Sequence, residues 1–197
     1  MNYLKPLIER NLHVNVRIKK NNQTCVLEFY SKEVVDFLVK VGLKRGSKSK
    51  QVEIPKTFLS STNFLKSFVE GFMDAEFCFT LKKRYKQFPY YPCIECNIAS
   101  KKIWKQLIDI FKSFGLKPSS CVIKEYDKRF HKYWTKYRID LNGVNNLIKF
   151  LKCFRPKNPK FIKFLSELSA TLRKNKIKRK SYSKLLCISQ RNSGGGI

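Results

Sequence analysis

The sequence is short of acidic residues, of histidine and of long apolar runs, and each shortage excludes a class of protein. Fourteen Asp and Glu stand against forty-two Lys and Arg, which gives a formal net charge of +28 over 197 residues. A charge this one-sided destabilises a compact chain by self-repulsion unless the chain meets a polyanion. Nucleic acid is therefore the expected partner, and a basic surface that binds nothing is the weaker interpretation.

Apolar runs that could cross a membrane are absent, because nowhere do about twenty apolar residues follow one another. Lys5, Glu9 and Arg10 interrupt the N-terminal segment, so it has no signal-peptide core. The sequence predicts a soluble intracellular protein, in the cytoplasm or an organelle matrix, with no membrane partner.

Histidine and cysteine chemistry is weakly represented. The only histidines are His13 and His131, and no nucleophile near either in the sequence suggests Ser-His-Asp or Cys-His catalysis. Seven cysteines make an odd set without framework spacing, which favours reduced, mostly buried thiols. Cys93 and Cys96 form the one close pair, but a three-residue offset in a strand sends them to opposite faces, so zinc is not expected.

The hydrophobic content of 43% supports a folded core, and the apolar periodicity predicts an α+β order of elements. From residue 60 onward the pattern predicts one helix, two strands, one helix, two strands and then further helices. The expected helices cover residues 64–75, 101–115, 144–154 and 161–174, and the expected strands cover residues 77–85, 91–99, 120–126 and 133–141.

The N-terminal part of the chain repeats the later half of that order. Helices expected at 4–12 and 33–41 enclose strands expected at 14–19 and 24–30. We therefore interpret the chain as a partial first repeat (1–55), a complete second repeat (56–174) and a basic tail (175–197) with sequence-independent affinity for phosphates. A complete first copy would need further residues upstream.

The helix expected at 64–75 has an unusual concentration of acids near its C-terminus. Glu70, Asp74 and Glu76 are three of only fourteen acids in the chain. Carboxylates at a helix C-terminus oppose the macrodipole at a cost of about 0.3–1 kcal/mol, so a compensating cation is expected. A divalent metal is one candidate, and ion pairs with Lys82 or Lys83 are the alternative.

The same helix has small residues at Ser67, Gly71 and Ala75, which are spaced four apart and share one face. Glycine inside a helix costs about 1 kcal/mol relative to alanine, so Gly71 needs a reason, and close approach of a second backbone is the usual one. The face therefore predicts a helix–helix interface.

The stretch Val69-Glu70-Gly71-Phe72-Met73-Asp74-Ala75-Glu76 resembles the LAGLIDADG motif of homing endonucleases. The order of elements resembles that family's αββαββα repeat, in which antiparallel, saddle-shaped sheets carry helices on one face. The resemblance covers nearly the whole chain up to about Lys174. It implies a site-specific endonuclease of intron or intein homing type, which hydrolyses phosphodiesters of double-stranded DNA with Mg²⁺ or another divalent cation.

By position, the resemblance implies that Glu76 binds the catalytic metal and that Asp74 assists it or orients the helix end. Phe77 stands where the motif usually ends in glycine, which puts a large side chain next to the metal position. The resemblance also implies basic side chains near the scissile phosphate, for which the candidates are Lys48 and either Lys157 or Lys160.

Alternating strands predict the surface that contacts DNA, because one face of each strand is apolar and the other polar. Arg and Lys on such a face reach guanine acceptors in the major groove, and Asn reaches adenine. An ordinary solvated sheet face is the alternative. The residues expected to contact DNA are Asn15, Arg17, Lys19, Thr80, Lys82, Arg84, Lys136 and Arg138.

One motif helix supplies half of a two-carboxylate site. The chain is therefore expected to form a homodimer, or to borrow a complementing half, through Ser67, Gly71 and Ala75, and to cut DNA poorly on its own. Two alternatives keep the scaffold: a catalytically inactive DNA-binding protein, and an intron maturase-like RNA-binding protein. An unrelated ribosomal or RNA-coating protein explains the charge but not the acidic helix end.

Overall fold

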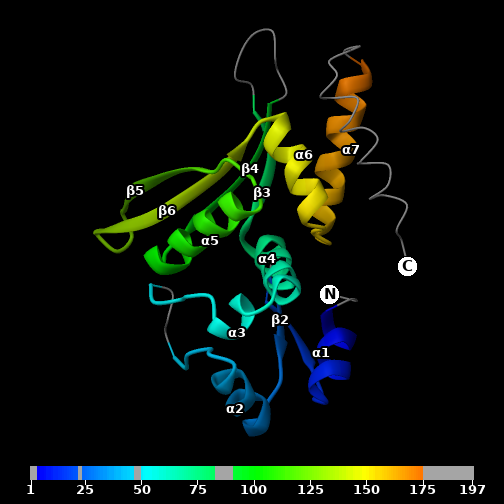
Figure 1. Cartoon of the computed structure of the whole chain (residues 1–197). Helices are drawn as coiled ribbons and strands as arrows, with labels where there is room; N and C mark the ends of the chain where they lie inside the picture. The colour runs from blue at the N-terminus through cyan, green and yellow to red at the C-terminus, as the bar shows by residue number, and fades with distance from the viewer. Residues whose placement is uncertain (1–3, 22–23, 47–49, 83–90, 175–197) are drawn as a thin grey trace. The chain divides into compact units, whose positions relative to one another are not determined.

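The computed structural model describes residues 4–21, 24–46, 50–82 and 91–174. The chain divides into two compact units, Met1–Gly46 and Ser47–Ile197, which are described separately (Figure 1). Both units are mixed α+β with antiparallel sheets, in agreement with the predicted class.

The first unit consists of two helices and a hairpin. Its elements are α1 (Leu4–Leu12), β1 (Arg17–Asn21), β2 (Thr24–Glu28) and α2 (Lys32–Lys40), and β1 pairs with β2 in antiparallel fashion. Ser31 caps α2, because its Oγ accepts a hydrogen bond from the amide of Val34 at 3.2 Å. Among the described residues of this unit, only the apolar side chains of Val16 and Val34 are buried.

The strand expected at 14–19 begins later than predicted. The amide of Val16 donates to the carboxylate of Glu9 at 3.0 Å instead of to a neighbouring strand, so β1 starts at Arg17 and Asn15 precedes it. Ile18, expected on the buried face, is 46% exposed. The alternation of apolar and polar residues in this strand therefore does not correspond to a buried face and a solvent-exposed face.

The second unit contains the predicted helix–strand order from residue 60 onward. Its elements are α3 (Lys56–Leu59), α4 (Thr62–Glu76), β3 (Cys78–Lys82), β4 (Tyr91–Ile98), α5 (Lys101–Ser113), β5 (Ser119–Asp127), β6 (Lys132–Asn142), α6 (Val144–Cys153) and α7 (Pro159–Lys174). The short α3 was not predicted, because a single turn has no apolar period. No helix in the described ranges is both long enough and apolar enough to span a bilayer.

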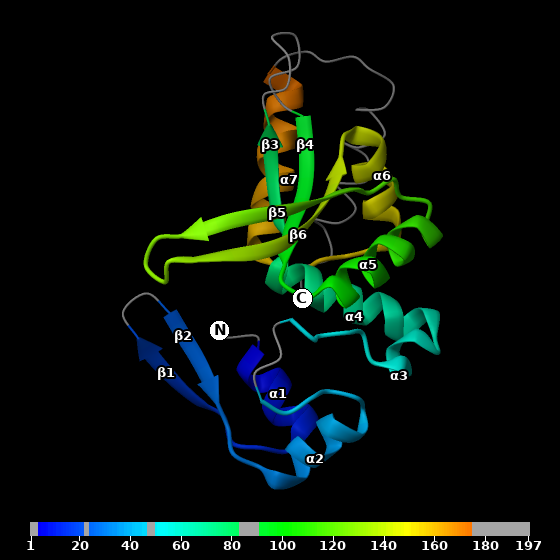
Figure 2. The ribbon, with the colours of Figure 1, turned by 90° about the vertical axis from the view of Figure 1, so that its left-hand side faces the viewer.

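The four strands of the second unit form one antiparallel sheet in the order β3-β4-β6-β5. The sheet is strongly twisted, so that the β5–β6 hairpin crosses the direction of β3 and β4 (Figure 2). In the register, Glu95 lies opposite Cys78 on one side and opposite Asp140 on the other. These residues therefore share one face of the sheet.

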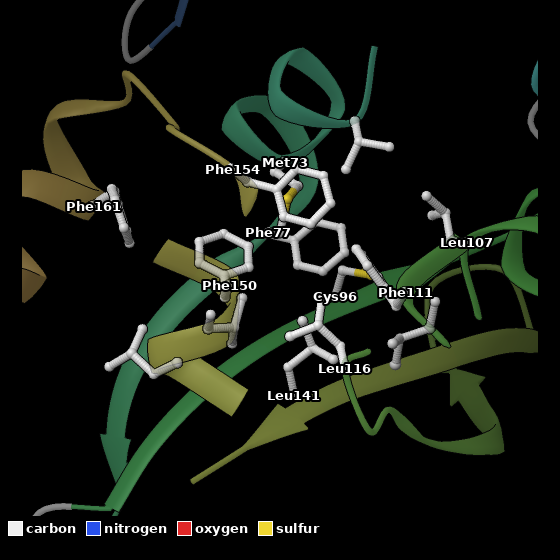
Figure 3. Packing of buried hydrophobic residues seen from close by; sticks show 14 of the residues in the cluster. Met73, Phe77, Cys96, Leu107, Phe111, Leu116, Leu141, Phe150, Phe154 and Phe161 are labelled. Atoms are coloured by element: carbon white, nitrogen blue, oxygen red, sulfur yellow. The ribbon is translucent and has the colours of Figure 1, made fainter. Parts of the chain in front are cut away.

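The opposite face of the sheet meets the helices and forms the core. Ile94 and Cys96 of β4 and Ile139 and Leu141 of β6 are buried there, and they pack in one cluster with side chains from α4, α5, α6 and α7 (Figure 3). Aromatic rings dominate this cluster: Phe111, Phe150 and Phe154 are each fully buried. The alternation along β4 and β6 thus separates an apolar, helix-covered face from a polar one.

Two details fix the chain between β6 and α6. Gly143 has φ +89°, and a Cβ added there would lie 2.7 Å from the hydroxyl oxygen of Tyr91, so only glycine fits. Asn146 is buried, and its amide bonds the backbone of Lys117 in both directions, at 2.8 and 3.0 Å. This side chain ties α6 to the loop that follows α5.

Candidate nucleic-acid interface and carboxylate site

The end of α4 is fastened to the link between α6 and α7. The two carboxylate oxygens of Asp74 accept hydrogen bonds from the backbone amides of Lys157 and Asn158, each at 3.0 Å. The side-chain amide of Asn158 donates in return to the carbonyl oxygen of Asp74 at 2.6 Å. Peptide N–H groups therefore offset the unfavourable helix dipole at Asp74, a partner that the sequence analysis did not consider.

Glu70 makes a similar contact one turn earlier. Its Oε1 accepts from the amide of Arg155 at 2.9 Å. Together, Glu70 and Asp74 hold the segment that carries Arg155 and Lys157 against the end of α4, and Lys160 follows in the first turn of α7. Arg155, Lys157 and Lys160 are all exposed. Lys48, the other expected lysine, lies outside the described residues.

Glu76, the last residue of α4, has different surroundings. It is exposed, and its carboxylate takes part in no hydrogen bond or ion pair among the residues that the structure describes. Of the three acids, only Glu76 thus has both oxygens open to a cation. As a hard oxygen donor it suits Mg²⁺, and it supplies one ligand where a complete site needs several.

Phe77 points away from this carboxylate. The residue is 5% exposed and its ring packs edge-on against Phe111, with centroids 6.0 Å apart (Figure 3). The sequence analysis expected this large side chain beside the metal position, but the ring lies in the core instead. The departure from glycine therefore anchors the helix end and leaves the surroundings of Glu76 open.

The small-residue face of α4 is exposed. Ser67, Gly71 and Ala75 are each exposed, and a Cβ added at Gly71 would meet no atom within 4 Å. Among the described residues of the second unit, no close packing explains the glycine. The face has room for a second helix, and the expected interface stays a prediction.

The polar face of the four-stranded sheet carries four of the eight expected DNA-contacting residues. Phe79 and Leu81 pack against the core, whereas Thr80 and Lys82 lie on the opposite, polar face, as the alternation predicts. Lys136 and Arg138 of β6 share that polar face and flank the core-facing Tyr137. Arg84 lies outside the described residues.

This polar face also holds acids that the sequence analysis missed. Arg138 donates through Nε and Nη2 to Asp140, at 2.9–3.0 Å, and through Nη2 to Glu95 as well. Lys82 pairs with the same oxygen of Glu95. The network raises the pKa of Lys82, chiefly through the hydrogen bond to Glu95, and that of Arg138, chiefly through the hydrogen bond to Asp140. The only sequence signal was the acids' alternation with apolar residues, which identifies a face but not a partner.

Cys93 lies beneath this network. Its thiol is 3.8 Å from a carboxylate oxygen of Glu95 and 3.8 Å from one of Asp140, and the three donor atoms lie within 4.8 Å of one another. A Cys, a Glu and an Asp so arranged could bind a metal ion. Lys82 and Arg138 already balance the two carboxylates, so a cation would have to displace them.

In the first unit, the expected contacts lie around a concave region of about 460 Å³. Asn15 and Arg17 line it together with Glu28 and Glu33. Lys19 pairs with Glu28 at 3.7 Å on the hairpin. The basic residues of this unit are therefore also interleaved with acids.

No protein-family model matches the chain, and no curated protein matches it. Among solved structures, the chain is similar to the LAGLIDADG homing endonuclease I-GzeII in complex with its DNA target. The two share 14% sequence identity at a TM-score of 0.36, over 82% of this chain and 52% of that one. The chain thus spans about half the length of that endonuclease, and a similarity of this size assigns neither an activity nor site residues.

Proposed function

We propose that this chain binds double-stranded DNA and carries, at the end of α4, one half of a divalent-metal-dependent endonuclease site of the LAGLIDADG type. The observation that carries the proposal is Glu76. It is an exposed carboxylate at a helix C-terminus without a hydrogen-bond or ion-pair partner among the described residues, next to the open face formed by Ser67, Gly71 and Ala75. A second motif helix on that face, from another copy or a complementing chain, would bring a second carboxylate beside the first.

The order of elements supports the repeat interpretation. The first unit runs α1-β1-β2-α2, which is the same order as α5-β5-β6-α6 in the second unit. We therefore propose that residues 1–55 are a partial repeat and 56–174 a complete αββαββα repeat, with saddle-shaped sheets. The proposed basic tail at 175–197 lies outside the described residues.

Each residue of the proposed site has a separate role. Glu76 would hold Mg²⁺, which when bound polarises the scissile phosphate and makes water a stronger nucleophile. Asp74 positions the α6–α7 link through its two amide contacts. In this proposal, Lys157 and Lys160 neutralise phosphate charge near the helix end.

One observation favours the inactive DNA-binding alternative. Both oxygens of Asp74 are engaged by backbone amides, so the chain offers one open carboxylate at this helix end where the sequence led us to expect two. On that alternative the basic sheet face remains and Glu76 is dispensable.

The decisive experiment compares the wild-type chain with Glu76→Gln and with Glu167→Gln, a control on α7 with the same charge change. Binding to a mixed-sequence 30-bp duplex is followed from about 50 to 200 mM salt, and Mg²⁺-dependent cleavage is measured on a plasmid library with random inserts. We expect affinity to fall by about tenfold or more over that range in all three proteins, because phosphate contacts release counterions.

Cleavage should be weak in the wild type and in Glu167→Gln and absent in Glu76→Gln. Equal cleavage by all three would exclude Glu76 as the metal ligand. If all three proteins bind DNA but none cleaves it, alone or mixed with a second chain that supplies another motif helix, the chain is an inactive DNA-binding protein. Preference for folded RNA over duplex in competition would point to the maturase-like alternative.

A further inference from the structure

The polar face of the sheet pairs its two central cations with acids, which is unexpected in so basic a chain. Glu95 and Asp140 are two of only fourteen acids, and the register places them directly opposite each other on β4 and β6. Their side chains are 21% and 15% exposed, so neither is a freely solvated surface charge. Their location in the middle of the proposed DNA-binding face calls for an explanation.

The network uses up most of the hydrogen-bonding capacity of Arg138. A guanidinium has five N–H donors: one on Nε and two on each terminal nitrogen. Nε and Nη2 donate to Asp140, and Nη2 also donates to Glu95, so only Nη1 has no acceptor among the described residues. Arg138 therefore cannot make a two-nitrogen contact with a guanine or a phosphate without releasing a carboxylate.

Glu95 is the shared acceptor of the network. Its Oε2 binds both Lys82 of β3 and Arg138 of β6, which joins the two outer strands of the β3-β4-β6 group across β4. A DNA phosphate offers only acceptors and negative charge, so it competes with Glu95 for both cations and is repelled by it. A G·C base pair is different, because its cytosine amino group can donate to Glu95 in place of Arg138. That exchange frees one Nη2 hydrogen, so that Arg138 can contact the guanine acceptors through Nη1 and Nη2.

We propose that Glu95 is a specificity-determining residue: it restrains Lys82 and Arg138 so that the sheet binds DNA backbone weakly and a G·C base pair well. This inference rests on the proposed DNA binding. Asp140 is the positioning residue of the network, because it fixes the guanidinium through two nitrogens. The raised pKa values of Lys82 and Arg138 agree with cations that the acids keep fully charged.

The test measures Glu95→Gln and Asp140→Asn against the wild type and the control Glu167→Gln, after thermal melting has confirmed that each variant is folded. For a mixed-sequence 30-bp duplex at 0.1 M salt, we expect both variants to bind about threefold to tenfold more tightly. For Glu95→Gln, the slope of log K against log salt should become more negative by about 1, because Lys82 loses its anionic partner while Arg138 stays bonded to Asp140. Glu167→Gln should stay within about twofold of the wild type.

Selection from a random duplex library gives the second readout. The wild type should enrich a G·C pair at a position where Glu95→Gln accepts any base pair. In a chain that also carries Lys82→Gln and Arg138→Gln, the Glu95→Gln substitution should tighten duplex binding by less than it does in the wild-type background, because the restrained cations are gone and only the repulsion between Glu95 and phosphate is relieved.

The outcomes separate this inference from the proposed function. If wild-type binding to duplex DNA shows no salt dependence, DNA binding itself is wrong and the role of Glu95 is wrong with it. If the wild type binds DNA but Glu95→Gln and Asp140→Asn bind no more tightly than Glu167→Gln, only the role of Glu95 is overturned. The same holds if the selected sites of wild type and Glu95→Gln are identical.

Discussion

Asp74 and Glu76 are two residues apart at one helix end, yet their surroundings differ. Asp74 has both oxygens bonded to backbone amides of the α6–α7 link, whereas Glu76 is exposed. Two carboxylates in nearly the same position thus differ in role: that of Asp74 is structural and, on the proposed function, that of Glu76 is chemical. Substitutions separate the two roles, because loss of Asp74 should affect stability, whereas loss of Glu76 should affect metal-dependent cleavage.

Asp74→Ala should lower the free energy of unfolding by about 1.5–3 kcal/mol, because two amides lose a charged acceptor. Glu76→Ala should change it by less than about 0.5 kcal/mol, as expected for an exposed side chain that pairs with no described residue. Urea denaturation followed by circular dichroism measures both. Equal costs for the two substitutions would mean that the amide contacts contribute nothing to stability.

The cysteines give a second prediction at this scale. Burial raises the pKa of the Cys93 thiol to about 11 and also raises that of Cys96, whereas Cys25, Cys78 and Cys121 are exposed. At pH 8 a thiol reagent should therefore modify the three exposed cysteines and leave Cys93 and Cys96 unmodified until the protein unfolds. Mass spectrometry of the labelled peptides reads this out, and rapid labelling of Cys93 in the folded protein would contradict it.

The same shift predicts a pH dependence of stability. The folded chain holds the Cys93 proton more tightly than the unfolded chain does, because the pKa of the thiol is higher in the folded state. Its contribution to the free energy of unfolding is therefore complete below the unfolded pKa of 9.0 and is lost as pH rises toward about 11. Lys82, whose pKa is raised from 10.5, acts in the same direction at still higher pH. The free energy of unfolding should thus fall above pH 9, and the fall should be smaller in Cys93→Ala.

At the scale of elements, α4 combines a fastened end with an open side. Val69 and Met73 are buried, while Ser67, Gly71 and Ala75 on the other side are exposed. A helix this exposed gains little from a glycine in its middle unless another backbone approaches it. Intrinsic helix propensity and the proposed interface therefore predict opposite effects of one substitution.

Gly71→Ala should stabilise the monomeric chain by about 0.5–1 kcal/mol, because the new methyl group has open space and alanine favours the helix. The same change should weaken self-association, or pairing with a complementing half, because the methyl group separates the two backbones. Thermal melting at low concentration and analytical ultracentrifugation measure the two effects. A substitution that stabilises without affecting assembly would place any interface elsewhere.

At the scale of the whole molecule, the two units differ in how much they bury. The hydrophobic cluster that includes Ile54, Phe111 and Leu172 lies entirely within the second unit. In the described part of the first unit the buried apolar side chains are Val16 and Val34, while Phe37 is 54% exposed. A unit of this size with so small a core has little stability of its own.

Hydrogen exchange of the full chain should therefore show faster exchange in residues 4–40 than in β4 and β6, by about tenfold or more. The reason is that opening the first unit exposes little apolar surface. Mass spectrometry of deuterated peptides checks this, with α1 and α2 as the reporters. Equal protection in both units would show that other contacts bury the first unit's apolar side chains.

Sequence periodicity predicted the order of elements in both units apart from the single turn α3, because a helix or strand with one buried face has apolar residues at a regular spacing. It could not find the partner of Asp74, since the amides of Lys157 and Asn158 lie more than eighty positions along the chain and an amide has no sequence signature. It also missed the contact of Glu95 with Arg138, which depends on strand register. The register is known only once all the strands are paired. Here it places Glu95 beside Lys82 and Arg138, so that two of the expected DNA-contacting cations are paired with an acid.

The buried ring of Phe77 has a consequence for engineering of the chain. The motif that α4 resembles usually has glycine at this position, and introducing glycine here would empty an enclosed aromatic site in the core, at a cost of about 3–5 kcal/mol. That loss approaches the whole stability of many small proteins. A Phe77→Gly substitution on its own is therefore expected to unfold much of the protein, so variants that bring α4 closer to the motif need compensating changes in the core.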